Sequence, residues 1–255
     1  MSLMARVDQA RNRLQAANER LSEARGLLDN LSYEVPDYGG ASNRAKYQRF
    51  DTTLAYMHEE MITNINNVDG IRFGNAAGDV LNAPASIVLE SLVPSWLPGL
   101  KEDVGEKASN APINLPKQAA LVAWGLKVRQ GGEWDHKPKL RELLDFNNEL
   151  PTFPIPGDDE HEYNYDIWSN IHYGYVGRSA GFEPYELLLG AQIADKGVVV
   201  PSDDLSARIG IELWEEYGTN LTPEQLHQAI LDHKEEYLRI QDETNIVVRP
   251  IDNGR

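Results

Sequence analysis

The sequence contains no cysteine. This absence excludes a disulfide framework, a thiolate nucleophile, a zinc ribbon and a cysteine-bound iron–sulfur cluster. A chain of this kind suits the reducing cytosol, but it also suits a protein that is exported afterwards and needs no disulfide. The absence of cysteine therefore excludes these classes of site, but it does not decide between a cytosolic and an exported protein.

Long apolar runs are missing as well. The most hydrophobic windows, Ala119–Leu126 and Leu187–Ala194, are interrupted by glycine, tryptophan or polar residues, and they are far shorter than the ~18 residues that span a bilayer. Met1–Arg13 has no apolar core of the kind found in secretory signal peptides. We therefore expect no membrane insertion and a cytoplasmic location in the producing cell, with export by a specialised secretion system left open.

Basic residues are scarce. There are 24 of them against 40 acidic residues, which gives a net charge of −16. Such a surface repels phosphates and argues against non-specific binding of nucleic acid. The segment Lys117–Arg141 is the exception, because it holds six basic and two acidic residues and so carries +4. A nucleic-acid substrate would have to bind in a small basic cleft near this segment.

The first thirty residues have a heptad pattern. Val7, Ala10, Leu14 and Ala17 begin a series of apolar residues at alternating spacings of three and four, which is typical of a coiled-coil-like helix. This helix either packs within the chain or mediates self-association or docking on a delivery partner. A loop at Tyr33–Asn43 then separates an N-terminal part, residues 1–44, from the main domain, residues 45–255.

The main domain is predicted to be helical. Helices are expected over Asp51–Val68, Pro116–Val128, Lys139–Asn148, Pro184–Asp195 and Ser202–Tyr217, with Ser202 as an N-cap. A capping box at Thr222 and Gln225 starts a last helix that ends near Asp242. Gly197–Pro201 and Ile246–Ile251 are β-branched runs that could pair. The predicted fold class is mainly α with a minor two-stranded β element.

Two segments have compositions that packing alone does not explain. In Trp124–Lys137 a helix leads into Gly131–Gly132 and then into Trp-Asp-His-Lys, although cations at a helix end also fit the helix dipole. Asp166–Gly181 contains Asn170, His172 and three glycines spaced by three and four residues. If the segment is extended, Asn170 and His172 share one side; if it is helical, the glycines share one face and imply close packing.

An acidic run lies between these two segments. Asp158, Asp159, Glu160, Glu162 and Asp166 surround His161, and we interpret the run as a solvated loop because no fixed ligand spacing marks a metal site. We predict no metal and no cofactor.

The motifs resemble a known family. Trp124…Lys127-Val-Arg, Gly-Gly-x-Trp-Asp-x-Lys137 and Asn170-Ile-His-Tyr-Gly, with Glu60-Met-x-x-Asn64 upstream and Leu-Leu-Leu-Gly-Ala-Gln192 downstream, are similar to the bacterial polymorphic toxin type 44 domain over residues 52–195. The resemblance implies a hydrolase toxin of interbacterial competition, delivered by a secretion apparatus and neutralised by an immunity protein. The activity it implies most directly is that of a ribonuclease.

Such a ribonuclease needs a base, an acid and cations for the phosphate. On the resemblance, His172 acts as acid or base, Asp135 or Glu60 is its counterpart, and Lys137 with Arg178 binds phosphate. Tyr173 and Tyr175 could stack a base. The remaining motif positions are assigned to substrate binding: Asn64, Trp134, Asn170 and Gln192.

Two other functions stay open. A cell-wall glycosidase would use Glu60, beside Met57 and Met61, as an acid of raised pKa and Asp135 as the second carboxylate. A non-enzymatic phage-tail or secretion-associated protein would use the N-terminal helix for assembly. Convergence of Glu60, Asp135, Lys137 and His172 in one cleft would favour an enzyme, and their dispersal would argue against both enzymes.

Overall fold

The computed structural model describes residues 36–68, 124–146, 151–194, 200–241 and 246–251. The predicted N-terminal helix and most of Pro116–Val128 lie outside these ranges, although residues 124–128 are helical. None of the described helices is long and apolar enough to cross a bilayer.

The described elements confirm a mainly helical fold. In chain order they are α2 (Ala41–Asn67), α8 (His136–Leu143), β1 (Thr152–Pro154), β2 (His161–Asn164), α9 (Asp166–Ser179), α10 (Pro184–Ala194), α11 (Pro201–Tyr217), a 3-10 turn (Gly218–Asn220), α12 (Pro223–Asp232), α13 (Lys234–Ile240) and β3 (Val248–Pro250).

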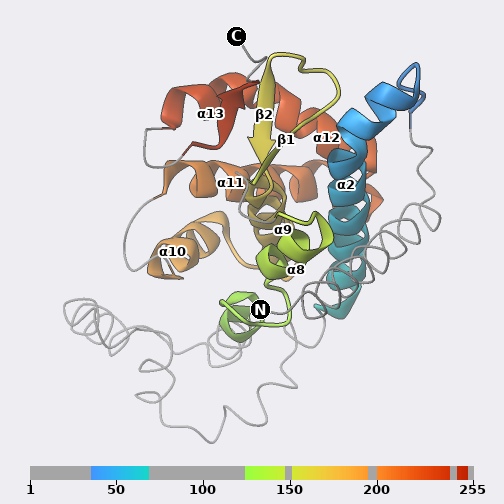
Figure 1. Ribbon diagram of the computed structural model, residues 1–255. Helices are drawn as coiled ribbons and strands as arrows, with labels where there is room; N and C mark the ends of the chain where they lie inside the picture. Colours follow the sequence, from blue (N-terminus) through green and yellow to red (C-terminus); the bar gives the residue numbers. More distant parts are fainter. Residues whose placement is uncertain (1–35, 69–123, 147–150, 195–199, 242–245, 252–255) are drawn as a thin grey trace, which may run out of the picture.

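Helix α9 lies at the centre of the fold. It packs most extensively against α11, and α2, α8 and α10 contact it as well (Figure 1). The crossing with α11 is close because Gly174 of α9 faces the Ala207 carbonyl and Gly210 of α11 faces the Ile171 carbonyl. The helical alternative for Asp166–Gly181 is therefore confirmed, with glycine allowing close approach of two backbones.

Several helix boundaries differ from the prediction. Helix α2 begins at Ala41, ten residues before the predicted Asp51, because no proline or glycine interrupts residues 41–50. Helix α11 begins at Pro201 with Val200 as N-cap, so Ser202 is not the cap. Thr222 and Gln225 form the predicted capping box, but α12 ends at Asp232 and α13 follows, so the expected single helix is wrong.

The strands form one antiparallel sheet in the order β1-β2-β3. Strand β3 pairs with β2, so the predicted pairing of Ile246–Ile251 with Gly197–Pro201 is wrong. Pro201 is the first residue of α11, and residues 195–199 lie outside the described ranges. The β-branched run of β3 indicated a strand, but composition does not specify a partner that is distant in sequence.

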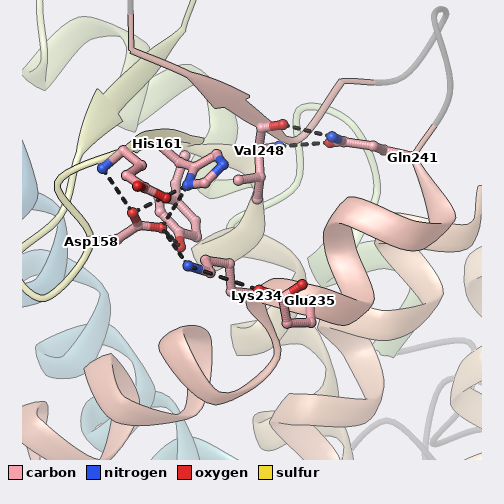
Figure 2. A network of polar contacts seen from close by, with 8 residues as sticks. Asp158, His161, Lys234, Glu235, Gln241 and Val248 are labelled. Atoms are coloured by element: carbon pink, nitrogen blue, oxygen red, sulfur yellow. Dashed lines mark hydrogen bonds and ion pairs between the residues drawn. The ribbon is translucent and has the colours of Figure 1, made fainter.

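The acidic run is not a solvated loop throughout. Its residues His161–Asn164 form β2, and Asp158 is 4% exposed. The Asp158 carboxylate accepts hydrogen bonds from Tyr163 Oη at 2.7 Å and from the Glu160 amide at 3.0 Å, and it lies 3.1 Å from His161 Nδ1 and 3.5 Å from Lys234 Nζ (Figure 2). This network joins the hairpin of β1 and β2 to α13. The prediction missed it because Lys234 is distant from Asp158 in the sequence.

Candidate active site

One face of α2 carries three polar side chains at helical spacing. Tyr56, Glu60 and Asn64 are four residues apart and therefore follow one another along the same face. This face is turned toward the middle of the fold, since Tyr56 is 8% exposed and Asn64 is 4% exposed, while Glu60 at the edge is half-buried.

Helices α8 and α9 each add a histidine to this face. His136 is the first residue of α8, and His172 lies midway along α9. Both are buried, with exposures of 2% and 0%. Asn64 Nδ2 lies 2.9 Å from His172 Nε2, and the same nitrogen of His172 lies 3.2 Å from His136 Nε2.

The contacts form a continuous chain of five residues, which we call the Glu60–Tyr56 chain: Glu60, Asn64, His172, His136 and Tyr56. At its outer end Asn64 Nδ2 donates to Glu60 Oε2 at 3.3 Å, and at its inner end Tyr56 Oη lies 3.0 Å from His136 Nδ1. The chain brings three helices together around polar groups. Buried polar groups of this kind stabilise a fold only when they are hydrogen-bonded to one another.

Burial favours the neutral form of each titratable group in the chain. It lowers the pKa of His136 to about 4, against a smaller opposing effect of Asp135. Burial, together with the neighbouring His136, holds the pKa of His172 well below its ordinary value. Both imidazoles are therefore neutral near pH 7.

Glu60 is shifted in the same sense. Partial burial raises the pKa of Glu60, the hydrogen bond from Asn64 lowers it, and the negative charges of Glu59 and Glu133 raise it further. Lys139 acts in the opposite direction. The Glu60 carboxyl thus shares its surroundings with two other carboxylates and one ammonium group. A carboxyl group in such a place can hold a proton at a pH where exposed glutamates have lost theirs.

An aromatic cluster adjoins the buried histidines. The Trp134 ring lies edge-on to His172, with centroids 6.2 Å apart, and edge-on to Trp124 at 5.6 Å. Lys127 Nζ lies 4.5 Å from the centre of the Trp134 ring. Trp134 is itself 4% exposed, so it contacts the site from the interior.

Two of the predicted catalytic residues are not in the chain. The Asp135 carboxylate accepts a hydrogen bond from the Gly131 amide at 2.8 Å, within its own turn. Lys137 Nζ pairs with Asp166 at 3.5 Å. Glu60 and His172 are thus linked through Asn64, whereas Asp135 and Lys137 have their own partners in the described structure.

The other predicted substrate-binding residues are spread over α9 and α10. Tyr173 Oη donates to the Leu187 carbonyl, Tyr175 Oη donates to the Gly218 carbonyl, and Tyr175 is fully buried. Arg178 pairs with Glu215 at 2.9 Å and with Glu183 at 3.9 Å. Asn170 is half-buried on α9, and Gln192 lies on α10. Their proposed roles in binding remain predictions.

Sequence reasoning assigned no role to Tyr56 or His136. Tyr56 precedes Glu60 by one helical turn, a spacing that could have placed it on the same face. His136 lies inside the Trp-Asp-His-Lys motif, but its contact with His172 depends on how α8 and α9 pack. Among the described residues no group of three or more histidine, aspartate or glutamate side chains is arranged to hold a metal ion.

Comparison with known families agrees with the motifs. Residues 123–196 match the model of the family described as bacterial toxin 44, Ntox44, so the predicted family is confirmed over this segment. The match includes Trp134, His136 and His172, whereas Glu60 and Asn64 precede it. No curated protein and no solved structure matches the chain.

Proposed function

Because residues 123–196 match the bacterial toxin 44 family, we propose that the chain is a hydrolytic toxin of interbacterial competition in which Glu60 is the acid–base residue. The observation that carries this proposal is the position of Glu60, half-buried at the outer end of the Glu60–Tyr56 chain with a raised pKa. A toxin of this class also requires a delivery apparatus and an immunity protein in the producing cell.

The substrate that these surroundings fit best is a glycosidic bond of peptidoglycan. Glycoside hydrolysis needs one carboxylic acid that is protonated near neutral pH and a second carboxylate close by. Partial burial raises the pKa of Glu60 and so increases the protonated fraction of its carboxyl group, and Met57 and Met61 on the same helix are fully buried. The negative charges that act on Glu60 are those of Glu59 on the same helix and of Glu133, so Glu133, which pairs with Lys127 at 2.7 Å, replaces Asp135 as the candidate for the second carboxylate.

The reaction then follows from these two groups. Glu60 donates its proton to the glycosidic oxygen as the bond from this oxygen to the anomeric carbon breaks. A water molecule adds to the anomeric carbon and gives its proton to Glu133. His172 is fully buried and neutral, so its role is to hold Asn64, which in turn holds the Glu60 carboxyl.

The test uses two neighbouring glutamates. Glu60→Gln keeps the hydrogen bond with Asn64 but cannot give up a proton, so we expect the release of soluble fragments from purified peptidoglycan to fall by at least about 100-fold. The matched control is Glu59→Gln, an exposed residue on the same helix that acts on Glu60 only through its charge, so activity should fall far less than in Glu60→Gln. Mass spectrometry of the fragments identifies the bond that is cut.

A ribonuclease is the second candidate, and it is the one that the sequence predicts first. Lys139 acts on Glu60, and Lys127, Arg129 and Arg141 belong to the same basic segment. In that case Glu60 takes the proton of the 2′-hydroxyl group and the basic side chains bind the phosphate. Lys137, Arg178 and Lys127 are weaker candidates for the phosphate site, because each already pairs with an acidic residue.

Expression in two compartments separates these candidates. A cell-wall hydrolase is toxic when directed to the periplasm and harmless in the cytoplasm, whereas a ribonuclease is toxic in the cytoplasm. If cytoplasmic toxicity depends on Glu60 and the purified protein degrades RNA but not peptidoglycan, the glycosidase proposal is wrong. If Glu60→Gln and wild type are equally toxic in both compartments, Glu60 is not the acid–base residue.

A further inference from the structure

In the inner half of the Glu60–Tyr56 chain, each hydrogen bond can be assigned a donor and an acceptor. We propose that Tyr56 and His136 are positioning residues that hold His172 in the neutral form with its proton on Nδ1, so that Nε2 keeps a lone pair for the Asn64 amide. The tautomer of His172 follows from the donors and acceptors of the chain in the state in which Glu60 is ionised. Its effect on catalysis rests on the function proposed for Glu60.

The first step starts at Glu60. A carboxylate only accepts hydrogen bonds, so the Asn64 atom 3.3 Å from Glu60 Oε2 is the amide nitrogen. The same nitrogen lies 2.9 Å from His172 Nε2 and donates its second hydrogen there. His172 Nε2 is therefore an acceptor, and a neutral imidazole with an unprotonated Nε2 carries its proton on Nδ1.

The second step continues through His136. Its Nε2 lies 3.2 Å from the His172 Nε2 that is already an acceptor, so His136 must be the donor in this contact. His136 Nδ1 is then unprotonated and accepts from Tyr56 Oη at 3.0 Å. Asn64 Nδ2 and His136 Nε2 thus share the single lone pair of His172 Nε2 as a three-centre hydrogen bond, and Tyr56 donates to His136.

The reverse arrangement fails at Asn64. If His172 carried its proton on Nε2, the Asn64 amide would have to turn so that its oxygen faced both His172 and the Glu60 carboxylate. Two acceptor oxygens would then lie 3.3 Å apart without a hydrogen between them while Glu60 is ionised. The charge of Glu60 therefore selects the amide orientation, and the amide orientation selects the tautomer of His172.

This arrangement leaves the other ring nitrogen of His172, Nδ1, with a buried proton. His172 Nδ1 is buried and has no hydrogen-bond partner among the described residues. A buried donor without a hydrogen-bond partner destabilises a fold. The opposite tautomer would also leave Nδ1 without a partner, and it would in addition break the hydrogen bond between Asn64 and Glu60. The tautomer with the proton on Nδ1 is therefore the more favourable one.

The direct test is the tautomer of each histidine. In uniformly nitrogen-15-labelled protein at a pH above the pKa of Glu60, long-range proton–nitrogen correlation spectra should show His172 protonated at Nδ1 and His136 protonated at Nε2. A His172 ring protonated at Nε2, or at both nitrogens, would overturn the proposal. This measurement on the wild type needs neither a substrate nor a variant, so it stands even if the proposed activity is wrong.

The positioning role needs a variant. Tyr56→Phe removes the donor to His136 Nδ1, so we expect the His136 tautomer to change and kcat on peptidoglycan to fall about tenfold, with KM within twofold. The acid limb of the pH–rate profile should move with it. The matched control is Tyr237→Phe, which removes a fully buried hydroxyl group that contacts Ser206 instead. It should change stability but not tautomers or pH profile.

The tautomer measurement and the Tyr56→Phe kinetics together distinguish three outcomes. If the tautomers agree and Tyr56→Phe shifts the pH profile, both Tyr56 and His136 are positioning residues. If Tyr56→Phe leaves the His136 tautomer and the pH profile unchanged, the positioning role is wrong. If no activity is found on peptidoglycan or RNA while the wild-type tautomers agree, the function proposed for Glu60 fails and the assignment of the tautomers stands.

Discussion

The buried titratable residues of this fold differ in whether their surroundings favour the charged or the neutral form. Glu60, His136 and His172 are shifted toward their neutral forms, because their partners do not compensate for lost hydration. Asp51 belongs to the same group. It is 3% exposed, and burial raises its pKa to about 6 despite a hydrogen bond of 2.6 Å from Tyr38 Oη and the charge of Arg44.

Asp51 should therefore destabilise the protein when it is ionised. Its folded-state pKa lies above the usual 3.8, so its contribution to stability is complete below about pH 4 and is lost as the pH rises through 6. We expect Asp51→Asn, which still accepts from Tyr38, to raise the free energy of unfolding at pH 8 by ~1–3 kcal/mol.

Urea unfolding at two pH values checks this prediction. The gain should disappear near pH 4, where the wild-type carboxyl is neutral as well. Asp232→Asn is the control, because Asp232 is exposed and its substitution should change stability by less than ~0.5 kcal/mol at either pH. A variant that is less stable than wild type at pH 8 would show that the carboxylate is needed in its charged form.

At the scale of elements, the contact between α9 and α11 determines where His172 lies. Gly174 and Gly210 lie where the two helices cross, and a Cβ atom at either position would overlap a backbone carbonyl of the other helix. Backbone atoms in packed helices cannot move aside as a flexible side chain can. The crossing therefore requires glycine at both positions. It fixes the position of α9, and with it the place where His172 contacts residues of α2 and α8.

Alanine substitutions test the crossing. Gly174→Ala and Gly210→Ala should each lower the free energy of unfolding by at least ~2 kcal/mol, because overpacking outweighs the better helix propensity of alanine. Gly125→Ala is the matched control, since Gly125 is helical and a Cβ atom added there would meet no neighbouring heavy atom. It should be neutral or up to ~1 kcal/mol more stable. Thermal or chemical unfolding measures all three variants, and equal effects would contradict the argument.

The same contact shows what the sequence could predict. Glycine spacing in Asp166–Gly181 indicated a helix face that something approaches closely, and the capping box at Thr222 located the start of α12, because both signals are local. The partner of the glycine face and the pairing of β3 with β2 depend on residues far apart in the chain. The site divides in the same way: motifs identified Glu60, Asn64 and His172, but the role of His136 follows only from the packing of α8 on α9.

At the scale of the whole molecule, the net charge of −16 at pH 7 causes self-repulsion, which falls as the pH approaches the isoelectric point near 4.8. Below that pH the molecule becomes positively charged and repels itself again, and particular carboxylates that the fold holds in charged form add to the loss of stability in acid. Asp158 is such a group. Burial alone would raise its pKa, but hydrogen bonds from Tyr163, the Glu160 amide and His161 outweigh burial and lower the pKa to about 2. Lys234 adds an ion pair from α13.

Asp158 should thus stabilise the joint between the sheet and the C-terminal helices. Since its folded-state pKa lies below the usual 3.8, the stabilisation is present above about pH 4 and is lost as the pH falls toward 2. The shift corresponds to about 2 kcal/mol at neutral pH. We expect Asp158→Asn to lose about this amount at pH 7 and to approach wild type near pH 2, as measured by urea unfolding.

The neighbouring Asp159 provides the comparison that isolates this effect. Its side chain is 85% exposed and pairs with Lys46 at 3.1 Å on the surface, where water and salt screen the interaction. Asp159→Asn should therefore change the free energy of unfolding much less than Asp158→Asn does, and salt should weaken its effect. If both substitutions lower stability equally at pH 7, the acid sensitivity reflects the overall charge of the molecule, and the buried network around Asp158 contributes nothing specific.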